Sequence, residues 1–130
     1  MMGKLVLVVD DEEMTRQMLA MLLGLGGFEA VEAENGLDAL AQVAKHHPDA
    51  IILDVMMPEM DGITMCKKLR ANPSTHAIPV IMLSGRTQIG AEDEGLAAGA
   101  NAYLRKPMEP KELLEILNEL VVAHPVSVRV

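Results

Sequence analysis

The sequence predicts an α/β domain in which helices cover both faces of a five-stranded parallel sheet, a doubly wound arrangement. Two observations lead to this class. Short runs rich in Val, Ile and Leu alternate with stretches of helical period, as expected of strands that are buried on both faces. Four of these runs also end abruptly in polar residues, and open α/β sheets bind their ligands beyond the carboxyl ends of the strands.

Five strands and five helices follow from these patterns, in alternation. The expected strands are 4–9, 29–33, 50–54, 80–83 and 102–104. The expected helices are 12–25, 36–46, 63–71, 91–98 and 109–123. The second strand alternates charged and apolar residues, which suits the edge of a sheet. We therefore expect residues 1–123 to form one domain, and 124–130, which have lost the helical period, to be a tail or the start of a linker.

The helices are recognised by their apolar faces and their ends. Gly26-Gly27 ends the first helix, Asn35-Gly36 turns the chain into the second, and glycines flank a weak fourth helix. Pro110 fits the first turn of the last helix, where a missing N–H costs nothing. The first helix should pack on the sheet through Met14, Met18, Met21, Leu22 and Leu25. The last helix should do so through Leu113, Ile116, Leu117 and Leu120.

Composition argues against several classes of protein. The formal net charge is −8 and no stretch is rich in Lys and Arg, so direct binding to nucleic acid or to an anionic membrane surface is not expected. Cys66 is the only cysteine, which rules out an internal disulfide and suits a reducing compartment. The apolar run after Lys4 is too short for a signal peptide or a membrane span. We expect a cytoplasmic protein.

Polar residues suited to a phosphoryl group and its metal follow or close four strands. Asp10 and Asp11 follow the first, Asp54 closes the third, Ser84 follows the fourth, and Lys106 follows the fifth. Because the carboxyl ends of parallel strands meet at one edge of the sheet, these side chains should converge. Three carboxylates suit a hard divalent ion, and Mg²⁺ fits best because it binds through carboxylates, water and substrate phosphate.

Each residue also has an ordinary structural interpretation. Asp11 could cap the following helix, Asp54 could start a loop, Ser84 could belong to a turn, and Lys106 could be a solvated surface lysine. However, an acid directly after a buried strand costs free energy unless it is paired, and a carboxylate there can attack phosphorus to form an aspartyl phosphate. Lys106 supplies a point charge for phosphate, and Pro107 after it suggests a constrained cis peptide bond. The joint occurrence at four strand ends favours a phosphoryl-acceptor site.

These motifs resemble those of the receiver domain of two-component response regulators, in particular the chemotaxis regulators. The resemblance covers residues 4 to about 122. It rests on Val-Val-Asp10-Asp11-Glu, Ile-Leu-Asp54-Val-Met-Met-Pro58-Glu-Met-Asp61-Gly62, Leu-Ser84-Gly85, Gly99-Ala-Asn-Ala-Tyr103 and Lys106-Pro107. It implies a flavodoxin-like fold with five helices and the strand order 2-1-3-4-5, an order that we adopt from the family.

The resemblance implies roles for the residues of the acidic site. Asp54 is expected to be the phosphoacceptor. Asp10, Asp11, Asp54 and the backbone carbonyl of Met56 are expected to bind Mg²⁺ as the cofactor.

The resemblance also implies how the site acts on its surroundings. Lys106 and Ser84 are expected to contact the phosphoryl group, and Tyr103 resembles an aromatic switch that turns inward when Ser84 moves toward the phosphate. In the family, the positions of Met56 and Arg86 tune the lifetime of the phosphoryl group. The residues found here leave that lifetime open.

The implied function is a phosphorylation-dependent signalling switch of a phosphorelay. Asp54 would take a phosphoryl group from a histidine kinase, a histidine phosphotransfer protein or a small acyl phosphate. The surface formed by the fourth helix, fifth strand and fifth helix would then change and control a downstream protein or a fused output domain. The protein would be a monomer or a phosphorylation-dependent dimer. It would catalyse only its own phosphorylation and dephosphorylation, so it is not expected to be an enzyme in the usual sense.

Three other functions are weaker. A Mg²⁺-dependent phosphatase with an aspartyl nucleophile needs a second Asp two residues after the nucleophile, where this chain has Met56. A flavin or nucleotide binder needs a loop rich in Gly or Ser/Thr after the first strand, and Asp-Asp-Glu-Glu stands there instead. A degenerate receiver that serves only as a scaffold is disfavoured because all five site positions are filled.

Overall fold

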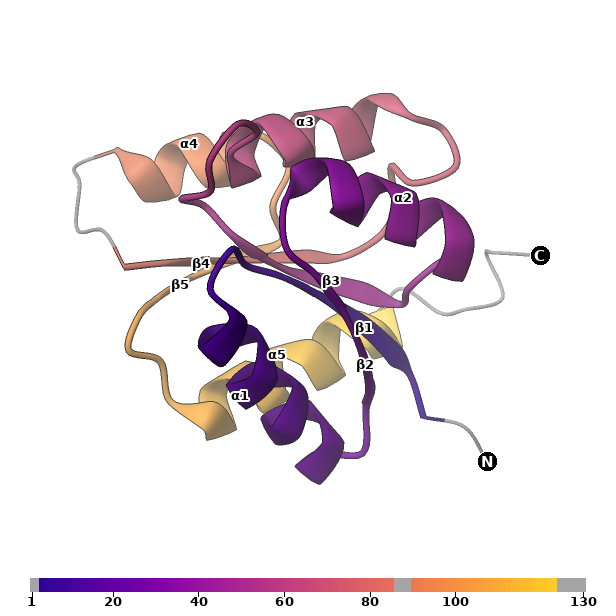
Figure 1. Ribbon diagram of the computed structural model, residues 1–130, viewed down its shortest axis with the longest axis vertical. Coiled ribbons are helices and arrows are strands. Elements are labelled where there is room, and N and C mark those ends of the chain that lie inside the picture. The colour runs from indigo at the N-terminus through magenta and orange to yellow at the C-terminus, as the bar shows by residue number, and fades with distance from the viewer. Residues whose placement is uncertain (1–2, 86–89, 124–130) are drawn as a thin grey trace.

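The computed structural model describes residues 3–85 and 90–123, and all ten predicted elements are present within one residue of the expected bounds (Figure 1). The strands are β1 (Leu5–Val9), β2 (Glu29–Ala33), β3 (Ala50–Asp54), β4 (Val80–Ser84) and β5 (Ala102–Arg105). The helices are α1 (Glu13–Leu25), α2 (Gly36–His46), α3 (Gly62–Ala71), α4 (Ala91–Ala97) and α5 (Pro110–Ala123). The predicted tail, 124–130, lies outside the described residues, so the domain boundary stays a prediction.

The strands form one parallel sheet in the order β2-β1-β3-β4-β5, which confirms the predicted class and strand order. β2 lies at an edge, as its alternating charges indicated. The register aligns the carboxyl ends of the central strands: Val9 is opposite Leu53, and Asp54 is opposite Leu83. Polar residues that directly follow these positions are therefore brought to one edge of the sheet.

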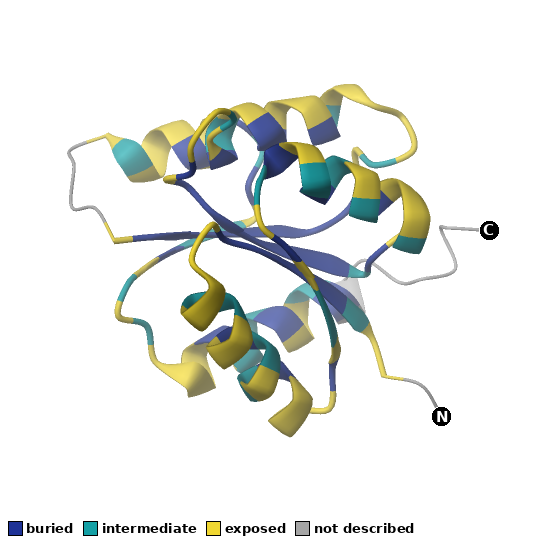
Figure 2. Cartoon of the chain, viewed as in Figure 1, coloured by how far each residue is buried: buried dark blue, intermediate teal, exposed yellow. Residues whose placement is uncertain are grey.

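Helices cover both faces of the sheet, with α1 and α5 on one side and α2, α3 and α4 on the other (Figure 1). Each interface holds its own apolar cluster, and Figure 2 shows the buried strands between the two helical layers. The first cluster includes Ala39, Val43, Met65, Cys66 and Leu69. The second includes Leu19, Leu23, Leu113, Leu117 and Val121. Within the described ranges, the helices are too short or too polar to cross a bilayer.

The predicted inner face of α1 is wrong for four of its five residues. Leu19 and Leu23 pack on the sheet, and Leu22 is partly buried there. The four outward side chains are Met14 (83% exposed), Met18 (58%), Met21 (70%) and Leu25 (82%). Two apolar stripes share this helix, and helical spacing cannot say which of them faces the sheet. By contrast, the predicted face of α5 is confirmed: Leu113 and Leu117 are fully buried, and Ile116 and Leu120 pack beside them.

Candidate functional site

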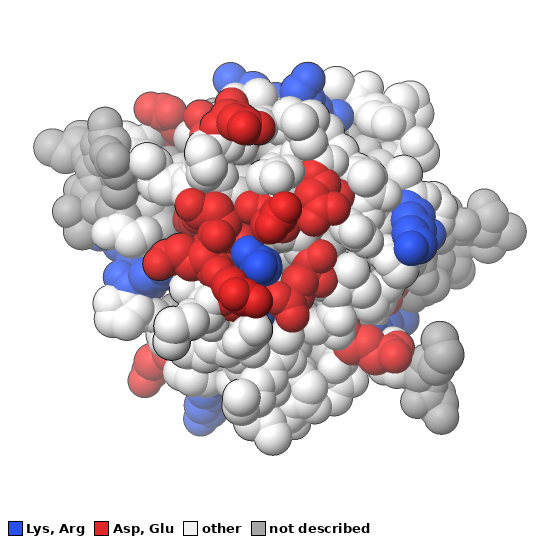
Figure 3. Space-filling model, viewed as in Figure 1, with Lys and Arg blue, Asp and Glu red and all other residues white. Residues whose placement is uncertain are grey.

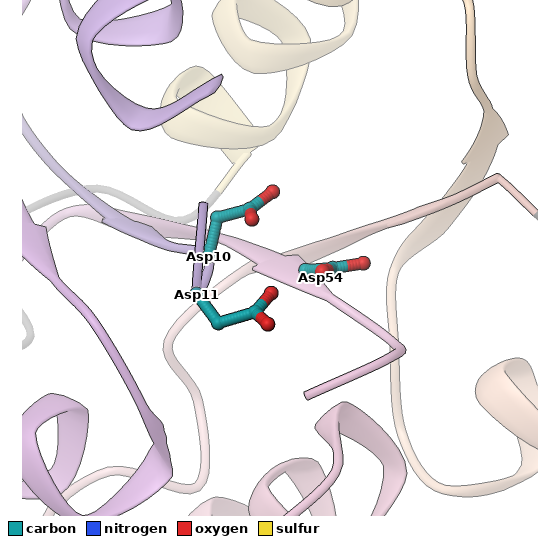
Figure 4. Close-up of side chains that lie close together, drawn as sticks. All are labelled: Asp10, Asp11 and Asp54. Atoms are coloured by element: carbon teal, nitrogen blue, oxygen red, sulfur yellow. The ribbon is translucent and has the colours of Figure 1, made fainter. Parts of the chain in front are cut away.

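Three aspartates from two adjacent central strands gather at the carboxyl edge of the sheet (Figure 4). Asp10 and Asp11 follow β1, and Asp54 is the last residue of β3. Each offers a carboxylate oxygen, and the three oxygens lie within 4.8 Å of one another. Asp10 and Asp54 are buried, with 1% and 5% of their surface exposed, whereas Asp11 is exposed. The predicted convergence of these acids is therefore present.

Asp10 is held in place through both of its carboxylate oxygens. The backbone N–H of Glu12 donates to Oδ1 at 2.9 Å, and the ammonium of Lys106 donates to Oδ2 at 3.1 Å. The guanidinium of Arg16 donates to the backbone carbonyl of Asp10 at 2.7 Å. The alternative in which Asp11 caps α1 is not supported, because the N-cap residue is Glu12, whose side chain makes no capping hydrogen bond.

Asp54 is placed by its strand and by the loop that follows it. The N–H of Met56 donates to Asp54 Oδ1 at 3.2 Å, and the Lys106 Nζ lies 3.7 Å from the same oxygen. Gly62 lets α3 begin beside this strand end, because a Cβ on residue 62 would lie 2.5 Å from the carbonyl oxygen of Asp54. Asp61 accepts a hydrogen bond from Thr64 N–H at 2.8 Å and caps α3, which accounts for that carboxylate structurally.

Burial and charge set the protonation of the site. Burial raises the pKa of Asp54 to about 6, Lys106 opposes this rise, and the nearby Asp10 and Asp11 add to it. Burial lowers the pKa of Lys106, but attraction by Asp54 and Asp10 outweighs burial, so that its pKa is raised overall. At neutral pH the Asp54 carboxylate is therefore mostly ionised and lies beside the Lys106 ammonium group.

An open cleft of about 310 Å³ lies over these groups. Its lining consists of Asp11, Glu12, Asp54, Met56, Gly85 and Lys106. Acidic side chains surround one basic group in the middle of this face of the molecule (Figure 3). The reactive groups are thus accessible from solvent although Asp54 itself is buried.

The donor set fits a divalent cation. Three carboxylates and one ammonium carry −3 + 1 = −2 charges, which one divalent ion would balance. Like charges held within 4.8 Å of one another repel, and a bound cation relieves that repulsion. Because the donors are oxygens, a hard ion is favoured over zinc or copper. This acidic pocket could bind a metal ion.

Ser84 and Tyr103 lie outside the cleft lining. Ser84, which is 1% exposed, ends β4, and its carbonyl accepts the N–H of Lys106 at 2.8 Å, so the two predicted residues are backbone neighbours. The Lys106–Pro107 bond is cis, as the sequence suggested. Tyr103 lies on the edge strand β5, in register with Met82 of β4. Arg86, which was expected to influence phosphoryl lifetime, lies outside the described residues.

Two residues of the site were missed by sequence reasoning. Glu12 lines the cleft and orients Asp10, although its position beside two aspartates suggested only a helix end. Arg16 bonds the Asp10 carbonyl and pairs with Glu32 at 3.3 Å. No sequence pattern indicated Arg16, because its partners come from β2 and from the end of β1.

Comparisons with known proteins agree with this geometry. A family model described as the response regulator receiver domain matches residues 6–118. The phosphate regulon transcriptional regulatory protein PhoB of Pseudomonas aeruginosa is 39% identical over 121 residues, which make up 93% of this chain and 53% of that protein. The chain thus spans about half the length of the curated relatives it matches.

Solved structures share the fold over nearly all of this chain. The chemotaxis protein CheY4 of Vibrio cholerae is 38% identical with a TM-score of 0.83, and the match covers 92% of this chain and 99% of that one. The receiver domain of the sensor histidine kinase PA1611 of Pseudomonas aeruginosa is 28% identical with a TM-score of 0.85, covering 92% and 98%. That structure has a magnesium ion coordinated in its active site cleft.

Proposed function

Because this chain belongs to the response regulator receiver domain family, we propose that Asp54 accepts a phosphoryl group in a Mg²⁺-dependent reaction and so switches the signalling state of the domain. The observation that carries the proposal is the placement of Asp54. Its carboxylate is buried at the cleft, close to Asp10 and Asp11, which follow β1, and to the ammonium of Lys106, which follows β5.

The metal belongs to this proposal as Mg²⁺. Asp10, Asp11 and Asp54, with the backbone carbonyl of Met56, would hold the ion. When bound, it would neutralise charge on the phosphoryl oxygens during transfer. The oxygen donors and the charge of −2 support a divalent ion, and the related PA1611 receiver domain has magnesium in its cleft.

The side chains of this chain would then carry the transfer. A carboxylate oxygen of Asp54 forms a bond to phosphorus while the bond from phosphorus to the donor histidine nitrogen breaks, and that nitrogen keeps the electron pair. Asp54 must be ionised to attack, which its pKa of about 6 allows at neutral pH. Lys106 lies 3.7 Å from Asp54 and would balance the incoming negative charge, and the Ser84 hydroxyl would donate to a phosphoryl oxygen.

The switch would follow from the added charge. Ser84 and Lys106 would be drawn toward the phosphoryl group, Tyr103 would change its position, and the surface of α4, β5 and α5 would be altered. The phosphodonor would be a histidine kinase or a histidine phosphotransfer protein. The receiving partner would be a downstream protein or a fused output domain, bound by a monomer or a phosphorylation-dependent dimer. The lone buried cysteine suits a cytoplasmic location.

The family match does not favour the phosphatase alternative. Met56 occupies the position where that class carries its second aspartate, and its side chain is 44% exposed at the cleft. Residue 56 therefore cannot serve as the general acid that turnover of a separate phosphate ester would need.

The proposal is tested by labelling with acetyl phosphate. With Mg²⁺, the wild type should gain the mass of one phosphoryl group, and Asp54→Asn should gain none. Asp61→Asn is the matched control, because this exposed acid caps α3 and Asn can also cap a helix. Removal of Mg²⁺ with a chelator should abolish uptake in the wild type and in Asp61→Asn. Equal labelling of wild type and Asp54→Asn would refute the assignment.

A further inference from the structure

Helix α4 carries a glycine where a helix would ordinarily avoid one. Gly95 is the fifth of the seven residues of α4 and the only buried one within it. Glycine in a helix interior is less favourable than alanine, because its backbone loses more conformational freedom on folding. In so short a helix, an unfavourable residue suggests that neighbouring atoms leave no room for a side chain at this position.

That requirement is visible in the contacts of Gly95. A Cβ on residue 95 would lie 2.8 Å from Sδ of Met82 and 2.9 Å from Cδ2 of Tyr103. Real Cβ atoms do not approach other heavy atoms so closely, so any side chain at residue 95 must displace a neighbour. Met82 and Tyr103 face each other across the β4–β5 pair, and Gly95 lies against both.

Tyr103 is the neighbour that can move. Met82 is fully buried on a strand flanked on both sides, whereas Tyr103 is half-buried on the edge strand β5 (Figure 1). The Tyr103 hydroxyl is buried and has no hydrogen-bond partner among residues 3–85 and 90–123. An unpaired buried hydroxyl disfavours the present ring position. Packing of the ring against Gly95 and Met82 therefore has to hold it there.

We propose that Gly95 is a positioning residue for Tyr103: its bare Cα forms the seat that keeps the aromatic ring against α4 before any phosphorylation. Residue 95 thus sets how closely the ring can pack against α4. Met82 is two residues before Ser84 on β4, so this seat adjoins the strand end at the phosphoryl site. The link from the seat to signalling rests on the proposed function, whereas the seat itself does not.

Tyrosine fluorescence can report the seat directly, because Tyr103 is the only tyrosine and the chain has no tryptophan. Gly95→Ala should make Tyr103 at least twofold more accessible to acrylamide quenching, without any phosphodonor present. Gly24→Ala is the matched control: it is also a helix glycine, in α1, but a Cβ there meets nothing within 4 Å. Its quenching should equal that of the wild type. A folded Gly95→Ala protein with unchanged quenching would overturn the proposal.

A second measurement decides the matter if Gly95→Ala folds poorly. Gly95→Ala should lower the urea midpoint much less in a Tyr103→Ala background than in the wild-type background. The reason is that the Tyr103 ring, which the new Cβ would displace, is absent from that background. Equal losses in both backgrounds would also overturn the seat.

The coupling to phosphorylation is tested separately. With acetyl phosphate and Mg²⁺, Gly95→Ala should take up the phosphoryl group like the wild type, but its Tyr103 quenching should no longer respond to it. A wild type that takes up no phosphoryl group would refute the proposed function, and the quenching without donor would still decide the seat. Equal responses of both labelled proteins would overturn the coupling.

Discussion

Asp54 combines deep burial with a location among like charges, and this has a consequence for stability. Its pKa of about 6 in the folded protein exceeds the ordinary value of 3.8. Between these two values the folded protein keeps a proton that the unfolded chain releases, so the free energy of unfolding falls as pH rises through this window. Without metal, Asp54→Asn should therefore raise the free energy of unfolding by about 3 kcal/mol at pH 7.5, and most of this gain should be lost near pH 4. Urea unfolding with a chelator at both pH values measures it. Asp61→Asn, an exposed capping acid, should not reproduce the gain, and a gain that is independent of pH would contradict the explanation.

At the scale of an element, α1 shows that one helix can carry two apolar stripes of which only one packs. Leu19 is 1% exposed within the cluster beneath the sheet, whereas Met18 is 58% exposed. Leu19→Ala should lower the free energy of unfolding by about 2–5 kcal/mol, because it leaves a cavity in a packed interface. Met18→Ala should change it by less than about 0.5 kcal/mol, since it removes little buried surface. Paired urea denaturation curves give both values. Comparable losses from the two substitutions would mean that the helix is rotated relative to the structure described above.

At the scale of the whole molecule, the acidic site exists only in the folded state. Asp10 and Asp11 follow β1 and Asp54 ends β3, so unfolding separates the three carboxylates. A ligand that binds only the folded state stabilises it, by about 2.7 kcal/mol at a hundredfold excess over Kd. Mg²⁺ should thus raise the urea midpoint of the wild type, and Na⁺ at matched ionic strength should not. Asp11→Asn should weaken the Mg²⁺ effect, whereas Lys106→Ala should keep it because the ammonium is not a ligand. Loss of the effect in Lys106→Ala would contradict its assigned role.

Much of this protein was determined by its sequence. Short continuous apolar runs that alternate with helical stretches indicate strands buried on both faces and joined by parallel crossovers, so the sheet and its two helical layers follow. The acids, the serine and the lysine converge because each stands at or after the end of a strand, and parallel strands end at the same edge.

Only the tertiary structure decided which surfaces meet. Helical spacing defines a stripe, but the path of the chain from Asp10 into α1 sets which stripe turns toward the sheet. Arg16 and the seat at Gly95 depend on atoms from other strands, and no local pattern records them. The spacing of residues can be read from the sequence. The rotation of a helix on the sheet and the close approach of two side chains depend on how separate elements pack together.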